Sequence, residues 1–347
     1  MNEIHAGPPA RLTRRGARGL IAAILLVCTA STCGDGGARR PAPNPIPELP
    51  PLPKQTDTPT DLGDRALAHV RAIVAIGPRT PGSPGLQRVR DYVAGQFEAL
   101  GLPARRDAFR NEKEKLDFQN LVVRIPGPTR DYVLLGAHID SKITKDHPDP
   151  SENFEFVGAN DGASGVGLLI ALAEKWVKSP PPCTIELAFF DGEESIPFRW
   201  DPDRSLFGSR HHAEAYGRAV LADPKLPRMS AMILLDMIGS ADLQLDDDTW
   251  SDPGLKSIVR AAAKTCGHAE LCFGYSQAVT DDHLPFRDQG VPVLDLIDLH
   301  DNPQWHTKDD TVAHLSAKSL QSVGEILWTA LPTIATRFAG ADPRRPR

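Results

Sequence analysis

Histidine and acidic residues stand at five places in the 347-residue chain where an apolar segment ends or begins. Carboxylates and histidine without thiolate are the ligand set of a catalytic zinc, which keeps one coordination position open for substrate. Singly, such residues are more often surface pairs, solvated charges or helix caps. Their shared position at segment ends favours a common metal site instead. The five places are His138 with Asp140 after 132–137, Asp161 before 163–177, Glu193 with Glu194 after 184–190, Asp236 after 231–235, and His306 after 291–297.

The segments that must position these residues alternate between two kinds. Short apolar runs predict strands, and apolar residues at helical spacing predict helices. Strands that alternate with helices predict the α/β class, here a three-layer sandwich with a mostly parallel, mixed central sheet. Ligands bind beyond the carboxyl ends of the strands in such sheets, so we expect the five places to converge on one rim. The predicted strands are 121–125, 132–137, 184–190, 231–235 and 291–297, and the predicted helices are 61–76, 86–100, 163–177 and 316–338.

The N-terminal segment predicts export. Residues 1–33 have a basic start followed by an apolar run at 20–30, which is typical of a signal peptide and short for a membrane span. Cys33 follows Ala-Ser-Thr in a loose lipoprotein cleavage box, so it is a candidate lipid anchor; a plain secretory signal is the alternative. Residues 34–60 are rich in proline and predict an extended spacer. A catalytic domain is expected over 61–340, in the periplasm or outside the cell.

Charge and cysteine content exclude other classes. Residues 1–40 carry six arginines against Glu3 and Asp35, so the remainder is more acidic than the net charge of −6 indicates. A chain this acidic, without a basic stripe, is not expected to bind nucleic acid. The cysteines at 183, 266 and 272 lack the spacing of a zinc site. Cys266 and Cys272 are close enough in sequence to pair. We expect a monomer.

Several short motifs are spread over most of the expected domain. They are 81–85 (Pro-Gly-Ser-Pro-Gly), 138–142 (His-Ile-Asp-Ser-Lys), 189–194 (Phe-Phe-Asp-Gly-Glu-Glu), 205–210 (Ser-Leu-Phe-Gly-Ser-Arg), 281–286 (Asp-Asp-His-Leu-Pro-Phe), 290–294 (Gly-Val-Pro-Val-Leu) and 305–307 (Trp-His-Thr). With these motifs the chain, from about residue 62 to the C-terminus, resembles the glutaminyl-peptide cyclotransferases (glutaminyl cyclases), which share a fold with zinc aminopeptidases.

The resemblance implies a role for each matched residue. A single Zn²⁺ would polarise the side-chain amide of an N-terminal glutamine, and the ring would close to pyroglutamate with loss of ammonia. Peptide or protein N-termini would be the substrates. By resemblance, Asp161, Glu194 and His306 bind the zinc, Glu193 is the general acid/base, Asp236 and Asp281 hydrogen-bond around the reacting amide, and Trp200, Trp305 and Lys142 shape the substrate pocket.

Two other functions remain open from the sequence. A two-zinc aminopeptidase would use His138 and Asp236 for a second metal, with Asp161 bridging the two ions. The motif at 160–165 (Asn-Asp-Gly-Ala-Ser-Gly) is closer to the aminopeptidase metal loop, and Asp295 stands where animal cyclases have a histidine. The Lys142, Trp200 and Trp305 positions favour the cyclase. A metal-free binding lipoprotein is the third possibility, against which the intact Glu193 beside Glu194 argues.

Overall fold

The computed structural model describes residues 46–145 and 147–340. The predicted signal peptide, Cys33 and the first part of the spacer lie outside these residues. No helix in the described ranges is long and apolar enough to cross a membrane. Within them, Cys183, Cys266 and Cys272 are free thiols, so Cys266 and Cys272 do not pair.

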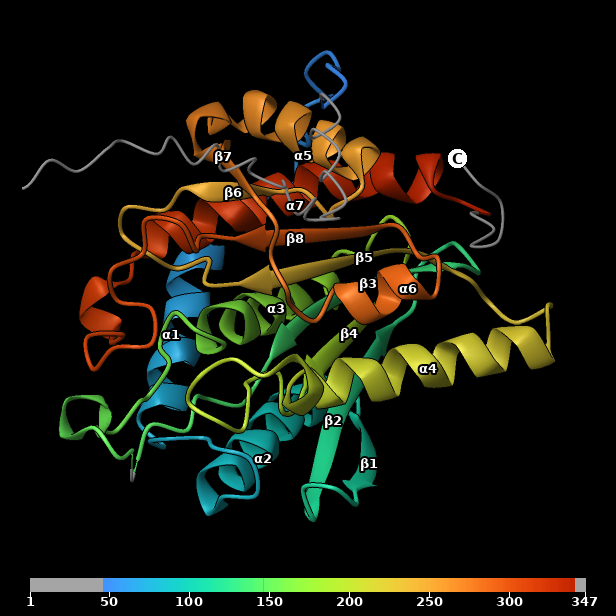
Figure 1. Cartoon of the computed structure of the whole chain (residues 1–347). Helices are drawn as coiled ribbons and strands as arrows, with labels where there is room; N and C mark the ends of the chain where they lie inside the picture. The colour runs from blue at the N-terminus through green and yellow to red at the C-terminus, as the bar shows by residue number, and fades with distance from the viewer. Residues whose placement is uncertain (1–45, 146, 341–347) are drawn as a thin grey trace, which may run out of the picture. The chain divides into compact units, whose positions relative to one another are not determined.

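A six-stranded mixed sheet runs through the centre of the molecule, with strand order β1-β2-β4-β3-β5-β8 (Figure 1). The four strands β4, β3, β5 and β8 are parallel to one another, whereas β2 is antiparallel to both of its neighbours. A separate pair, β6 and β7, is parallel. The strands are β1 (Arg105–Asn111), β2 (Leu116–Ile125), β3 (Tyr132–His138), β4 (Thr184–Phe190), β5 (Met229–Asp236), β6 (Leu245–Asp248), β7 (Cys272–Gln277) and β8 (Val293–Ile297).

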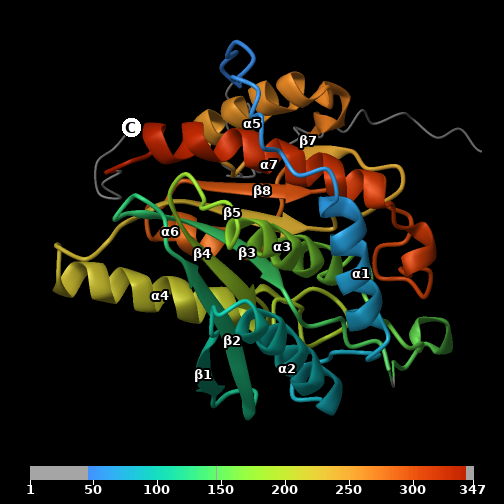
Figure 2. The same ribbon diagram turned by 180° about the vertical axis from the view of Figure 1, so that it is seen from behind.

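Helices cover both faces of the sheet. In Figure 1, α4 and α6 lie in front of the strands, and Figure 2 shows α1, α2, α3 and α7 on the opposite face. This arrangement confirms the predicted α/β sandwich with a mostly parallel, mixed sheet. The α-helices are α1 (Leu62–Val74), α2 (Pro84–Ala99), α3 (Ala163–Trp176), α4 (Phe207–Ala222), α5 (Pro253–Cys266), α6 (Leu284–Asp288) and α7 (Ala317–Arg337), and the 3₁₀ turns are η1 (Pro150–Glu152), η2 (Pro202–Arg204), η3 (Ala269–Leu271) and η4 (Val312–His314).

The central strands are apolar because both of their faces are covered. Every residue of β3 and of β5 is buried, which is the pattern of parallel strands between two helical layers. Their shared direction brings the carboxyl ends of β3, β4, β5 and β8 to one edge. His138 and Asp236 are the last residues of β3 and β5, so the edge of the sheet itself supplies two of the expected site residues.

The structure extends the predicted sheet at its antiparallel end. β2 begins at Leu116, five residues before the apolar run, and β1 is an edge strand whose three arginines, Arg105, Arg106 and Arg110, are exposed. Asn120 is polar yet fully buried, because its side-chain amide donates to Gly208 O and its oxygen accepts from Asp191 N. These polar contacts come from distant parts of the chain, so apolar patterning alone did not predict this part of β2.

The described part of the expected spacer is packed on the domain. Ile46, Leu49 and Leu52 are half-buried against the main core. Two hydroxyl groups of α5 hold the same segment: Ser257 Oγ donates to Pro47 O at 2.5 Å, and Thr265 Oγ1 donates to Leu52 O at 2.8 Å. Residues 46–52 therefore add to the apolar core beside α5.

Candidate active site

Three side chains from different segments meet beyond the carboxyl edge of the sheet. His306 Nε2 lies 3.1 Å from Glu194 Oε1 and 3.3 Å from Asp161 Oδ2. One ligand atom from each residue falls within 4.8 Å of the others. Both carboxylates approach the same imidazole nitrogen, so the three donors point at a common centre. We call Asp161, Glu194 and His306 the pocket cluster.

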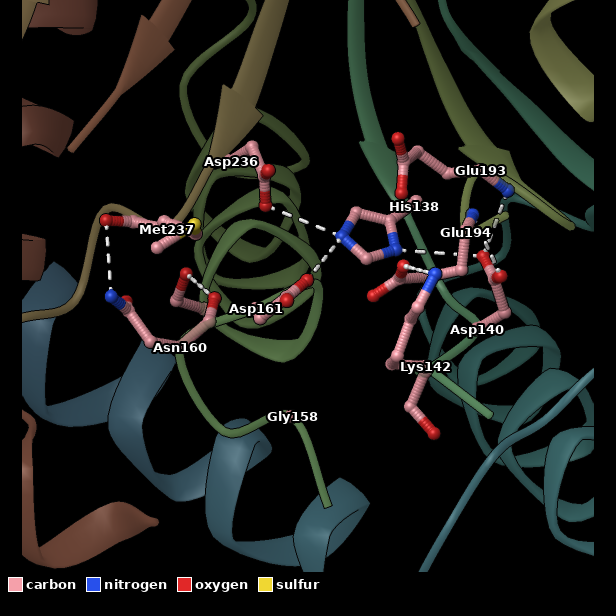
Figure 3. A network of polar contacts seen from close by, with 12 residues as sticks. His138, Asp140, Lys142, Gly158, Asn160, Asp161, Glu193, Glu194, Asp236 and Met237 are labelled. Atoms are coloured by element: carbon pink, nitrogen blue, oxygen red, sulfur yellow. Dashed lines mark hydrogen bonds and ion pairs between the residues drawn. The ribbon is translucent and has the colours of Figure 1, made fainter. Parts of the chain in front are cut away.

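A second group shares Asp161 with the pocket cluster. His138 Nε2 lies 3.0 Å from Asp161 Oδ1 and 3.3 Å from Asp236 Oδ1. Figure 3 shows both carboxylates reaching the same side of the His138 ring. These three residues also offer ligand atoms within 4.8 Å of one another. Asp161 therefore directs one oxygen to each group.

The donor atoms fit a divalent metal ion. His138 Nε2, Asp161 Oδ2 and Asp236 Oδ1 are buried, and none of them makes a hydrogen bond within the described part of the chain. Buried polar atoms are normally hydrogen-bonded. Buried, unpartnered donor atoms that converge on one point have the arrangement that a metal requires, and nitrogen with carboxylate oxygen suits first-row divalent ions. In the pocket cluster, His306 Nε2 and Glu194 Oε1 are also within hydrogen-bond distance of each other, at 3.1 Å.

A buried arginine ties together the loops that carry these ligands. Arg79 has no exposed surface. Its guanidinium donates to backbone oxygens: Nε to Ile139 O at 2.9 Å, Nη1 to Val157 O, and Nη2 to Gly158 O at 3.0 Å and to Asp161 O at 3.3 Å. The loop after β3 and the loop before α3 are thus fastened to one side chain.

Two aspartates that are outside the metal groups hold the ligand backbones. Asp140 accepts from Glu193 N at 3.1 Å and from Glu194 N at 3.2 Å, as Figure 3 shows. Asp310 accepts from the backbone N–H of Asn160 at 2.7 Å and of Asp161 at 3.1 Å. Each carboxylate links two loops that are far apart in sequence, so these contacts hold the backbones of the candidate ligands in place.

Backbone conformation at two positions also serves the site. Gly162 has φ +84°, and a Cβ there would lie 2.8 Å from the His138 ring, so only glycine fits between Asp161 and α3. His306 has φ +53°, in the left-handed region that non-glycine residues rarely adopt. Its ring is held edge-on against Phe156, with centroids 5.8 Å apart, and stacks on Trp305 at 4.4 Å. Strained backbone of this kind tends to occur at functional sites.

Glu193 lies beside the pocket cluster without joining it. Burial raises the pKa of Glu193 well above its ordinary value, and the carboxylates of Asp281 and Glu194 raise it further. Burial likewise raises the pKa of Asp281, helped by Asp236. A buried carboxyl group with a raised pKa holds a proton more readily than a solvated one, which suits a group that both takes and gives a proton.

The site opens into a cavity of about 580 Å³, a volume typical of small-molecule pockets. Trp200 and Trp305 line it and are 40% and 45% exposed. Lys142 also lines it, but its ammonium group is held by Ser195 O at 2.9 Å and lies 3.3 Å from Glu194 Oε2. Of the expected site residues, the cavity wall includes Lys142, Asp161, Glu193, Glu194, Trp200, Asp236, Asp281, Trp305 and His306, whereas His138 is buried behind it.

Some residues of the site were not identified from the sequence. Arg79 and Asp310 hold ligand loops through contacts that cross 82 and 149 residues of chain. Glu152 and Phe198 line the cavity. The position of Arg79 just before the 81–85 motif was the one available signal, and it is a weak one.

A second histidine lies between two aspartates behind the cavity. His283 Nε2 is 3.2 Å from Asp248 Oδ2, and His283 Nδ1 is 3.6 Å from Asp295 Oδ2. All three side chains are fully buried. Burial raises the pKa of Asp295 well above its ordinary value, with Asp281 and Asp248 adding to the effect. We call Asp248, His283 and Asp295 the sealed cluster.

Known proteins share this fold and these sequence features. Residues 120–331 match the model of peptidase family M28. A glutaminyl-peptide cyclotransferase-like protein from Bos taurus is 32% identical over 275 residues, which cover 72% of this chain and 70% of that protein. The crystal structure of a glutaminyl cyclase from an Acidobacteriales bacterium matches with a TM-score of 0.73 at 34% identity, covering 83% of this chain and 100% of that one.

An aminopeptidase shares the fold as well. The crystal structure of a leucine aminopeptidase precursor from Bacteroides thetaiotaomicron matches with a TM-score of 0.71 at 25% identity, covering 80% of this chain and 98% of that one. The fold is thus common to both enzyme classes, whereas the 32% and 34% identities are to cyclase relatives. The chain belongs to peptidase family M28 and, within it, to the glutaminyl-peptide cyclotransferases.

Proposed function

We propose that the protein is a zinc-dependent glutaminyl-peptide cyclotransferase, which converts the N-terminal glutamine of peptides to pyroglutamate and releases ammonia. One observation carries this proposal. A buried carboxyl group with a raised pKa, Glu193, stands next to a convergent three-ligand cluster in a cavity walled by two exposed tryptophans.

The pocket cluster would hold one zinc ion. When bound there, zinc would act as a Lewis acid on the side-chain carbonyl of the N-terminal glutamine. Asp161, Glu194 and His306 leave room for such a substrate, because structural zinc sites have four protein ligands whereas catalytic sites have three. Arg79, Asp140 and Asp310 would keep these ligands in place.

Glu193 would move the proton in the reaction. The α-amine nitrogen of the substrate forms a bond to the side-chain amide carbon, and the bond from that carbon to the amide nitrogen breaks. Glu193 takes a proton from the attacking nitrogen and returns one to the nitrogen that leaves as ammonia. Asp281 and Asp236 line the same cavity and would hydrogen-bond around the reacting groups. Trp200 and Trp305 would enclose the glutamine side chain.

The products of a glutamine peptide test the proposal. We expect the purified, zinc-loaded protein to release one ammonia per peptide without shortening the chain, as read by mass spectrometry. One zinc per chain is expected by metal analysis. A peptide shortened by one residue would instead identify an aminopeptidase.

The aminopeptidase is the second candidate because of one observation. His138, Asp161 and Asp236 form a second convergent group beside the pocket cluster. Two bound metals per chain, together with hydrolysis of the first peptide bond, would favour that function. Loss of the second metal in Asp236→Asn, with the first retained, would locate it.

The cellular setting is also part of the proposal. We infer that residues 1–33 direct export, that Cys33 is a candidate lipid anchor, and that the enzyme acts as a monomer on peptide N-termini outside the cytoplasm. Cell fractionation of the full chain and of Cys33→Ser tests this. A wild-type protein that stays in the cytoplasm would contradict export, and an unchanged membrane fraction in the variant would contradict the anchor.

A further inference from the structure

Glu152 is the acidic residue of the cavity wall that the reaction does not use. The other lining carboxylates, Asp161, Glu193, Glu194, Asp236 and Asp281, are at most 7% exposed. Glu152 is half-buried and keeps contact with solvent. Its side chain makes no hydrogen bond or ion pair in the described part of the chain. The Glu152 carboxylate is therefore available to a ligand in the cavity.

Local contacts hold Glu152 at the cavity. Glu152 ends the short turn η1, and its backbone N–H donates to Asp149 O at 3.0 Å. The Asp149 carboxylate is occupied within the turn, because it accepts from Ser151 N at 2.9 Å and from Ser151 Oγ at 2.7 Å. The His147 ring packs on Phe198 of the cavity wall, with centroids 4.6 Å apart. The turn is thereby fixed beside the loop that carries Trp200.

The charge of Glu152 is not neutralised from within the cavity. Among the described residues that line the cavity, Lys142 is the lysine and none is an arginine. The Lys142 side chain is buried, and its ammonium group is held by Ser195 O and Glu194. A cation that entered the outer part of the cavity would therefore meet a free carboxylate, whereas an anion would be repelled.

The exposed indoles of Trp200 and Trp305 also favour a positively charged ligand. Both line the cavity that Glu152 lines. The face of an indole attracts ammonium and guanidinium groups, and arginine also stacks on it. The cavity of about 580 Å³ is in the range that holds drug-sized ligands, so it has room for more than one amino-acid residue.

We infer that Glu152 makes the enzyme select peptides in which lysine or arginine follows the N-terminal glutamine. This inference rests on the proposed function, because it assigns the second residue of that substrate to the outer cavity. The α-amine and the side-chain amide of the glutamine are consumed at the metal end. The side chain of the next residue is then the first one free to reach Glu152.

The test compares matched peptides that differ at the second residue. Gln-Lys and Gln-Glu hexapeptides are assayed for ammonia release, and a Gln-Ala hexapeptide with lysine at its last position controls for long-range attraction to the acidic protein. We expect kcat/KM to favour Gln-Lys over both. In Glu152→Gln we expect the Gln-Lys to Gln-Glu ratio to fall about fivefold, mainly through KM. Added salt is expected to weaken the wild-type preference.

Glu155→Gln is the matched control variant. Glu155 is an exposed glutamate three residues from Glu152 and is not part of the cavity wall. We expect the wild-type ratio in this variant. An unchanged ratio in Glu152→Gln, or an equal fall in Glu155→Gln, would overturn the inference.

Failure of the proposed function gives a different result. If no peptide loses ammonia, the cyclase proposal is wrong. The preference for a positively charged second residue is then measured as a difference in peptide affinity. Calorimetry on zinc-loaded Glu193→Gln protein measures the affinities of the two peptides without turnover. Tighter binding of Gln-Lys that depends on Glu152 supports the inference, and equal binding refutes it.

Discussion

The pocket cluster and the sealed cluster use the same residue types at similar distances. Each is a histidine between two carboxylates, at 3.1 and 3.3 Å in one and at 3.2 and 3.6 Å in the other. In the pocket cluster both carboxylates approach one nitrogen, Nε2 of His306. In the sealed cluster they approach opposite nitrogens of His283, so their oxygens point away from a common centre.

This difference separates a candidate metal site from a set of buried ion pairs. Donors that converge on one side of a ring can share an ion with it, whereas carboxylates on opposite sides of the His283 ring can only pair with it electrostatically. Exposure agrees with the geometry: the His306 side chain is 19% exposed, and the sealed cluster has no exposed surface. We therefore expect the first cluster to support activity and the second to support stability.

The largest effect is expected at Glu193, the proposed proton carrier beside the pocket cluster. Glu193→Gln removes the carboxyl group but keeps the shape of the side chain, so kcat should fall about 10²- to 10⁴-fold. Zinc content should stay at the wild-type level, because Glu193 is outside the ligand set. Turnover and metal analysis on the same sample measure both. Wild-type turnover in this variant would refute the acid/base assignment.

The next effect is expected in the sealed cluster. His283→Ala leaves Asp248 and Asp295 buried without their shared partner, which should lower the free energy of unfolding by about 3–5 kcal/mol. Zinc affinity of the folded protein should be unchanged. Urea unfolding of metal-free protein and zinc titration measure the two quantities. Loss of zinc binding with stability unchanged would reverse the roles of the clusters.

Added zinc should also distinguish the two clusters, through a smaller change in the free energy of unfolding. A ligand that binds only the folded state at 100 times its Kd stabilises by about 2.7 kcal/mol. Thermal unfolding with and without zinc should show this stabilisation in the wild type and in His283→Ala. His306→Ala serves as the matched variant and should show little of it. An equal response of His306→Ala would place the metal elsewhere.

The smallest effect is expected at Asp298, which directly follows β8 at the carboxyl edge of the sheet. Burial raises the pKa of Asp298 to about 7, with the carboxylates of Asp246 and Asp301 adding to the effect. Its proton therefore stabilises the fold fully below about pH 4, and this stabilisation is lost as the pH rises through about 7.

Substitution of Asp298 should remove part of this pH dependence. Between about pH 6 and 7 the wild type should lose about 1 kcal/mol more unfolding free energy than Asp298→Asn. Urea unfolding at the two pH values measures the difference. Equal pH dependence in the two proteins would mean that the buried carboxyl group does not hold its proton in this range.

The sequence predicted the parallel strands, and the residues at their carboxyl ends, well. These strands are apolar throughout, and parallel strands that end in His138 and Asp236 must bring those residues to one edge. The predicted α/β sandwich and the five predicted strands are confirmed, and the family resemblance is confirmed by the relatives. The roles of the individual site residues stay predictions.

What the sequence could not predict depends on long-range contacts. Nothing in the sequence around His283 indicates its partners, and only the fold reveals aspartates beside both of its nitrogens. Asn120 and β1 are positioned by polar contacts and edge pairing rather than by apolar burial. Glu152 lies in a polar turn, and its place in the cavity follows from the packing of His147 on Phe198.

Arg79 has a consequence for how this site can change over evolution. Its guanidinium donates to main-chain oxygens of the two ligand loops, and a carbonyl oxygen is common to all twenty amino acids. When a substitution changes a side chain in these loops, the main-chain oxygens remain, so the N–H groups of Arg79 keep their acceptors. The main-chain frame of the candidate metal site is therefore insulated from side-chain substitutions in these loops, so the loops can change their side chains without a new scaffold.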